Sequence, residues 1–284
     1  MNKALQLECI CKTFQEFKLS DINFTLKKGH IMGLIGENGA GKTTIINCIL
    51  NIIKPEQGSI KILNKDNIKY EISLKEKIGV VFDSNYFEND WSIKHIEHLF
   101  KIFYKQWNHE KFKYFCMKFN LSKKKKIHEL SKGMQMKLMV ACALSYDSEL
   151  LILDEPTSGL DPTSRNELLE ILHEYVKDGN KSVLFSTHIT SDLDKIADEI
   201  TFIGNGRVIY TGEKLKLINS FKKITNQCTS LTPELEKYLI GLKIKENTFS
   251  ALIKTDYVKL FPSISYIDAT LDDIIIYTNK EIKR

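Results

Sequence analysis

The sequence contains no apolar segment long enough to cross a membrane. Its longest uninterrupted apolar run, residues 138–144, has seven residues, whereas a spanning helix needs about 20. The first twelve residues also lack the apolar stretch of a signal peptide. We therefore expect a cytoplasmic protein that reaches the membrane only through a partner.

The sequence is also poor in features that would indicate metal clusters, disulfides or nucleic-acid binding. Its six cysteines are scattered and none belongs to a CxxC pair. This argues against a structural zinc site, because such a site needs four converging ligands. We predict buried, reduced thiols, as in a reducing compartment. The net charge of +5 is too small to indicate nucleic-acid binding by itself, so no nucleic-acid partner is expected.

What the chain does have is an ordinary globular composition, with 284 residues of which 43% are hydrophobic and 27% charged. That length accommodates one substantial core and a small second domain. Residues 1–215 alternate compact apolar runs with amphipathic stretches, which predicts a layered α/β domain. The predicted strands are residues 31–35, 77–82, 150–153 and 182–186, and the predicted helices are residues 42–53 and 162–177.

Two other regions have a different pattern. Residues 91–120 place apolar side chains at steps of three and four, which predicts a helical subdomain at about residues 88–145, inserted into the sheet domain. The residues that carry this pattern are Ile93, Ile96, Phe100, Phe103 and Trp107. We interpret them as its core, with a partner-binding groove along one edge as the alternative. Residues 221–284 predict a small α+β accessory domain, with a helix at 233–242, strands, and a helix from Leu271.

The strongest local motif is GENGAGKT at residues 36–43, which matches GxxxxGK[ST] between a predicted strand and a predicted helix. Glycines such as Gly39 and Gly41 allow backbone N–H groups to turn around a phosphate, and the following helix directs its positive end at the same anion. We assign Asn38 to this phosphate-binding loop as well. The alternative is a glycine-rich loop that matches the motif by chance. The strand predicted before the motif and the helix predicted after it favour the phosphate-binding loop.

The residues that follow the glycines complete a nucleoside triphosphate site. Lys42 is placed to reach the β- and γ-phosphates, and the Thr43 hydroxyl is placed to bind Mg²⁺. Thr44 would support the α-phosphate. The motif therefore predicts binding of a nucleoside triphosphate with magnesium.

A second motif, LLILDEP at residues 150–156, is an apolar strand that ends in two acids. Such a strand carries Asp154 to the sheet edge, beside the Mg²⁺ held by Thr43. Glu155 then lies one residue further on, where its carboxylate would polarise the attacking water. A helix cap is the structural alternative, although adjacent buried acids are unfavourable without a cation.

Three further motifs make the pattern specific: LSKGMQ at residues 130–135, SGLD at residues 158–161, and His188 after a predicted strand. In this order they resemble the ATP-binding subunits of ABC transporters, whose signature is usually LSGGQ. The resemblance covers residues 4 to about 215. It implies a P-loop NTPase sheet domain with an inserted helical subdomain and an N-terminal antiparallel β subdomain.

The resemblance also implies roles for individual residues. Ser131 and Gly133 would contact the γ-phosphate bound to the opposite subunit, and His188 would hold the γ-phosphate and the attacking water. Phe14 would stack on adenine, with a plain core phenylalanine as the alternative. Asp161 would lie at the dimer interface.

Three positions depart from the family pattern: Lys132 and Met134, which replace the usual Gly and Gln of the signature, and Asp83. The signature reads SKGM, as in bacterial exporters of drugs, antibiotic peptides or polysaccharides. Asp83 stands where most relatives have glutamine, so it would be either an acidic magnesium contact or a plain loop residue.

The resemblance implies an ATPase that uses ATP and Mg²⁺ and that forms a head-to-tail homodimer, or a heterodimer. It would drive a separate polytopic permease at the inner face of the membrane, and the SKGM variant favours export over import. Only 89 positions separate Lys42 from Ser131, which excludes the long coiled coil of chromosome-organising ATPases. The single P-loop disfavours a tandem translation factor.

Overall fold

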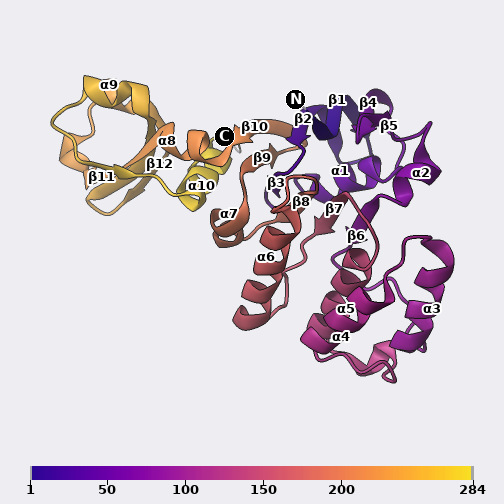
Figure 1. Ribbon diagram of the computed structural model, residues 1–284. Helices are drawn as coiled ribbons and strands as arrows, with labels where there is room; N and C mark the ends of the chain where they lie inside the picture. The colour runs from indigo at the N-terminus through magenta and orange to yellow at the C-terminus, as the bar shows by residue number, and fades with distance from the viewer. Residues whose placement is uncertain (1, 283–284) are drawn as a thin grey trace.

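A computed structural model describes residues 2–282 and is built around a six-stranded sheet of order β10-β9-β3-β8-β7-β6 (Figure 1). Five strands are parallel and the edge strand β10 is antiparallel to β9. In β3, β7, β8 and β9 every residue is buried, because both faces of the sheet are covered. The strands are β3 (Ile31–Ile35), β6 (Ile78–Val81), β7 (Leu150–Asp154), β8 (Ser182–Thr187), β9 (Glu199–Gly204) and β10 (Arg207–Glu213).

Each face of this sheet packs into its own core, and alternate residues of a strand contribute to opposite cores. In β7, Leu150 and Ile152 pack with helix α1 (Lys42–Ile49) and with an N-terminal antiparallel sheet. Leu151 and Leu153 pack with α5 (Lys132–Leu144) and α6 (Pro162–Val176) on the other face. The antiparallel sheet has the order β2-β1-β4-β5, with β1 (Lys3–Thr13), β2 (Lys18–Lys27), β4 (Gln57–Ile62) and β5 (Lys65–Asp66). The predicted α/β class with an N-terminal β subdomain is confirmed, although α1 ends before the predicted residue 53.

The helical subdomain is a separate group of helices beyond β6 (Figure 1). Ser92, Asn108 and Ser131 cap its helices by accepting backbone N–H groups three residues on. Its elements are α3 (Ile93–Phe103), α4 (His109–Lys118), a 3-10 turn (Ile127–Glu129) and α5 (Lys132–Leu144), with the short α2 (Glu71–Lys75) nearby.

The predicted core of this subdomain is only partly correct. Ile93 and Ile96 are fully buried, and Phe100 and Trp107 pack against the core from partly buried positions. Phe103 is 70% exposed. The predicted helical region also breaks before Asn108, whose side chain caps a new helix, and this break leaves Phe103 at the end of α3.

Two further helices pack in the same core as α5, on one face of the sheet. A third sheet follows them in the chain. The helices are α6 (Pro162–Val176) and α7 (Thr190–Ile196). The C-terminal sheet has the order β12-β13-β11-β14. Its elements are α8 (Lys214–Asn219), β11 (Phe221–Gln227), α9 (Pro233–Glu236), β12 (Leu239–Lys245), β13 (Thr248–Lys254), β14 (Tyr266–Asp268) and α10 (Leu271–Ile282), with 3-10 turns at Cys228–Ser230 and Thr255–Leu260.

The predicted helix at residues 233–242 is wrong beyond Glu236. Leu239 and Ile240 instead pair with Ile253 and Leu252 in the C-terminal sheet. Their apolar side chains suit a half-buried strand, and this tertiary pairing outweighs the local helical pattern. The helix predicted from Leu271 is confirmed.

The predicted burial of the cysteines is also only partly correct. Cys48, Cys116 and Cys142 are buried and all six thiols are free, but Cys9 is exposed. Cys9 has a φ of 51° at a register shift in β1, where the bulge redirects the side chain. Among the described residues, no helix is both long and apolar enough to cross a bilayer.

Candidate active site

The phosphate loop lies between β3 and α1, and its shape depends on glycine. Gly41 has a φ of 110° and caps α1. A Cβ there would lie 2.7 Å from the side chains of Phe17 and Leu19, closer than carbon atoms approach. The loop therefore requires glycine for both its backbone conformation and its packing, and it leaves the N-terminus of α1 free to bind an anion.

Lys42 is held inside this loop. Its side chain is almost fully buried, and Nζ donates to the carbonyl oxygens of Gly36 at 2.9 Å and Glu37 at 3.2 Å. The same ammonium lies 3.4 Å from Oε1 of Glu155. A buried cation is thus positioned where the loop would hold phosphates.

A polar cluster at the ends of β7 and β8 provides the oxygen donors for a cation. Thr43 Oγ1 donates to Asp154 Oδ2 at 2.8 Å, and Ser186 Oγ donates to Asp154 Oδ1 at 2.5 Å. Burial raises the pKa of Asp154, and the nearby negative charges of Asp83 and Glu155 raise it further. A desolvated carboxylate beside a hydroxyl suits Mg²⁺, whose charge would offset this cost.

Glu155 and His188 lie together at the same edge of the sheet. The Glu155 backbone N–H donates to the hydroxyl of Ser186 at 3.0 Å, and its φ of 48° turns the chain sharply after β7. Its Oε2 lies 2.8 Å from His188 Nδ1, whereas the buried Oε1 accepts no hydrogen bond. One carboxylate oxygen of Glu155 is therefore oriented by His188, and the other faces the Lys42 ammonium at 3.4 Å, so the carboxylate is held beside the phosphate loop.

The signature residues lie at the N-terminus of α5. Ser131 caps the helix by accepting the N–H of Met134 at 3.3 Å, and it is exposed. Gly133 is close to Leu160, whose Cδ2 would lie 3.3 Å from an added Cβ. Gln135 donates to two carbonyl oxygens of the preceding turn. The described hydrogen bonds of this motif thus stay within the helical subdomain, away from the phosphate loop.

The remaining predicted residues surround the phosphate loop. Phe14 lies in the turn after β1 and is 41% exposed, with the Lys12 ammonium 5.8 Å from its ring centre. Asn38 and Gly39 are exposed on the loop, and Thr44 is half-buried in the first turn of α1. These positions leave an aromatic face and a polar loop open on one side of α1.

The sequence analysis missed residues that act through packing and hydrogen bonds. Ser186 holds both Asp154 and the Glu155 backbone, and its signal is a hydroxyl residue at the end of a buried strand, two positions before a histidine. Phe17 packs on Gly41, and its signal is a second aromatic residue near Phe14.

The sequence analysis also missed a buried network that joins the loop after β7 to α7. Asp192, which is 1% exposed, accepts hydrogen bonds from Thr157 Oγ1 at 2.8 Å and Arg165 Nε at 2.5 Å. Thr157 follows Glu155 by two residues, and Asp192 lies on α7 after His188. No spacing rule connects these three side chains before the chain folds.

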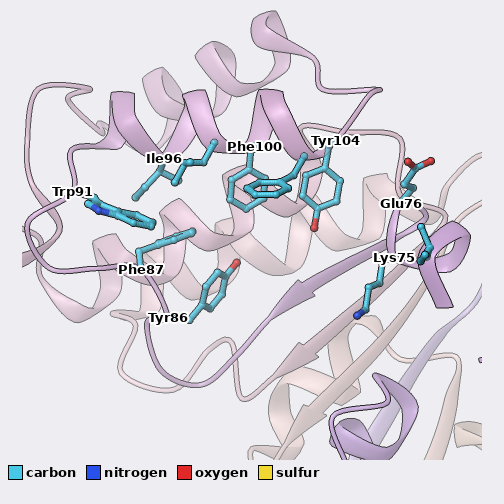
Figure 2. Close-up of a pocket in the computed structure, with 11 residues that line it drawn as sticks. Lys75, Glu76, Tyr86, Phe87, Trp91, Ile96, Phe100 and Tyr104 are labelled. Atoms are coloured by element: carbon cyan, nitrogen blue, oxygen red, sulfur yellow. The ribbon is translucent and has the colours of Figure 1, made fainter. Parts of the chain in front are cut away.

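A second concave site lies on the helical subdomain, away from these polar residues. It is a groove of about 540 Å³ between α2, α3 and the loop after β6. Ile96, Phe100 and Tyr104 point from α3 toward Tyr86 and Phe87 on that loop (Figure 2). Its lining also includes Ile72, Trp91, Leu99 and Phe103. A groove is therefore present along this edge, and its use for binding a partner stays a prediction.

Comparison with known proteins shows which family the chain resembles. The model of the ABC transporter family matches residues 19–158. The chain is 32% identical over 208 residues to the ABC transporter ATP-binding protein NatA of Bacillus subtilis, covering 70% of this chain and 83% of that protein. It is 32% identical over 214 residues to the bacitracin transport ATP-binding protein BcrA of Bacillus licheniformis, covering 74% and 69%.

Other relatives and solved structures agree. The chain is 29% identical over 268 residues to the energy-coupling factor transporter ATP-binding protein EcfA2 of Clostridium tetani, covering 87% and 92%. A solved ATP-binding subunit of an ABC transporter matches with a TM-score of 0.69 at 25% identity, covering 75% of this chain and 91% of that one. A dimeric ATP-binding cassette bound to ADP and phosphate shares the fold, with a TM-score of 0.66 at 23% identity, covering 74% and 98%. The chain therefore belongs to the ABC transporter ATP-binding family, as an ATP-binding ATPase subunit of a transporter.

Proposed function

We propose that this ATPase works as a head-to-tail dimer that drives a separate membrane permease, and that it does so for export. The observation that carries the proposal is the separation, on one chain, of the phosphate loop and the signature motif. The phosphate loop is completed by Asp154 and Glu155, whereas the capped N-terminus of α5 is exposed and contacts neither of them. A second subunit would bring its α5 to the nucleotide held by the first.

Within this dimer the chain's own residues have distinct tasks. Lys42 and the glycine-rich loop would bind the phosphates, and Phe14 would stack on the base. Thr43 and Asp154, with Asp83 near them, would hold Mg²⁺, which when bound neutralises phosphate charge. Glu155 would accept the proton of the attacking water, and His188, 2.8 Å from its carboxylate, would orient that carboxylate and the γ-phosphate.

The aromatic groove supports docking of a permease. It combines buried Ile96 with half-exposed Phe100 and exposed Phe103, which is the composition of a site that binds an apolar helix. An adjoining cavity of about 350 Å³ shares Lys75 and Tyr104 with it. We infer that a cytoplasmic segment of the permease inserts here and that dimer closure moves it.

The direction of transport and the domain division belong to the same proposal. The SKGM signature and the similarity to a bacitracin transport protein support export of a drug, an antibiotic peptide or a similar compound. We propose residues 1–215 as the ATP-binding domain and residues 221–284 as an accessory domain. The second region supports this division with its own small core, which contains Ile224, Leu235, Phe249 and Ile253.

Purification of the tagged chain from detergent-solubilised membranes, with mass spectrometry of bound proteins, tests this function. A stoichiometric polytopic membrane protein is the expected result, and its reconstitution in vesicles gives the direction of transport. Ribosomal proteins, DNA-bound factors or no partner at all would contradict the transport role. Accumulation of substrate on the side of the vesicle that holds the ATPase would contradict export alone.

A further inference from the structure

The C-terminal helix α10 packs directly on α7, the helix that follows His188 (Figure 1). Leu271 and Ile274 of α10 are buried in one continuous core with Leu193 and Ile196 of α7. The same core extends to Phe185 of β8, the strand that leads into His188. The C-terminal region is therefore packed against α7, which follows this histidine, and shares a continuous core with β8, which precedes it.

Polar contacts fix α7 at its two ends. Thr190 Oγ1, in the first residue of α7, donates to Asp272 Oδ1 of α10 at 3.3 Å. At the other end, Lys214 Nζ donates to the carbonyl oxygens of Leu193 at 3.0 Å and Asp194 at 2.7 Å. The N-cap residue of α7 provides no side-chain cap of its own. Asp272 thus adds a polar contact at the N-terminus of α7, where Asp192 already provides a negative charge in the first turn.

The same helix also reaches the phosphate loop. Asn279 of α10 is buried to 8% exposure and lines a polar cavity of about 120 Å³. The other walls of this cavity include Gly39 and Ala40 of the phosphate loop and Asn205 of the β9–β10 turn. One C-terminal helix therefore borders both loops that would contact the nucleotide phosphates.

We propose that Asp272 is a positioning residue for ATP hydrolysis, acting through Thr190 on the loop that carries His188. This inference rests on the role proposed above for His188. The histidine lies only two residues before Thr190 and must stay within hydrogen-bond distance of Glu155. A displacement of about 1 Å from the reactive geometry can lower the reaction rate about 10²-fold. Loss of the contact between α10 and α7 should therefore lower the ATP turnover rate.

Steady-state ATPase kinetics of the full-length chain test the inference. For Asp272→Ala and Thr190→Val we expect kcat to fall about threefold to tenfold, the equivalent of one hydrogen bond, with the KM for ATP unchanged within about twofold. Thr190→Ser keeps the hydroxyl and should restore turnover. Asp268→Ala is the matched control, because Asp268 pairs with Lys222 inside the C-terminal sheet. Wild-type kcat in both Asp272→Ala and Thr190→Val would overturn the inference.

A double variant separates positioning from general destabilisation. In a His188→Ala background, Asp272→Ala should cause no further loss of single-turnover rate, because its effect passes through the histidine. A further loss of the same size as in the wild type would overturn the inference. Wild-type turnover in His188→Ala would contradict the role of the histidine itself. Impaired turnover in His188→Ala, with wild-type turnover in Asp272→Ala, would contradict only the role of Asp272.

Discussion

The edge of the parallel sheet and the groove of the helical subdomain differ in how far contacts within the chain satisfy or cover their side chains. At the sheet edge, Asp154 and Lys42 are buried and are satisfied by hydrogen bonds and ion pairs within the chain. In the groove, Phe103 and Ile72 are 70% and 85% exposed. Removing such apolar side chains from water is favourable. The first site is preorganised by contacts within the chain, whereas apolar side chains of the second are exposed, which supports the proposed docking of a permease there. Variants in one region should therefore leave the other region's activity intact.

The largest effect is expected for Glu155→Gln. Loss of the proton-accepting carboxylate should lower the ATP turnover rate about 10² to 10⁴-fold, while the affinity for ATP and the binding of the permease are kept. Size-exclusion chromatography with ATP should then show a stable dimer, because hydrolysis no longer reopens it. Glu174→Gln, on an exposed face of α6, is the control. Turnover equal to that of the wild type would remove Glu155 as the base.

Lys42→Ala should act on binding rather than on the chemical step. Removal of a buried cation that faces phosphate costs about 2 to 5 kcal/mol, so the Kd for ATP should rise thirtyfold or more in titration calorimetry. Lys177→Ala removes an exposed lysine that pairs with Glu174 and should leave the Kd unchanged. An unaltered affinity in Lys42→Ala would contradict the assignment of the phosphate loop.

Unlike these two variants, Phe103→Glu should affect permease binding and not ATP binding or hydrolysis. A charge on the groove should weaken permease binding by about 2 kcal/mol, or about thirtyfold, as expected for an interface anchor. ATP hydrolysis by the isolated chain should not change. Met117→Glu, on an exposed position of α4 in the same subdomain, should leave co-purification intact. Equal permease recovery in Phe103→Glu and the control would place the docking surface elsewhere.

The smallest effect is expected for Phe14→Ala. Loss of aromatic stacking on the base should cost about 0.5 to 1.5 kcal/mol, which raises the Kd for ATP roughly twofold to twelvefold. Phe14→Tyr preserves the ring and should bind like the wild type. If both variants bind ATP normally, the neighbouring Phe17, whose ring centre is 6.4 Å away, becomes the candidate for base stacking.

The sequence predicted best where local chemistry sets the conformation. Residues 31–35 form a strand as predicted, and Pro162 begins α6 because proline suits the first helical turn. It predicted less well where two weak patterns compete, as at residues 239–242, which pair into a sheet with β13. The exposed Phe103 illustrates the same limit, because apolar periodicity marks a face without stating what covers it.

The sequence by itself therefore determined the family, the α/β class and the identity of the phosphate loop, since these depend on short local motifs, on apolar patterns and on their order along the chain. The proximity of Thr43 and Asp154 followed from their motifs, whereas only the tertiary structure brought Asp192 to Thr157 and Asp272 to Thr190. Such contacts join residues far apart in the chain, and they form only after the packing of the sheet, α7 and α10 has offset the entropy of closing long loops.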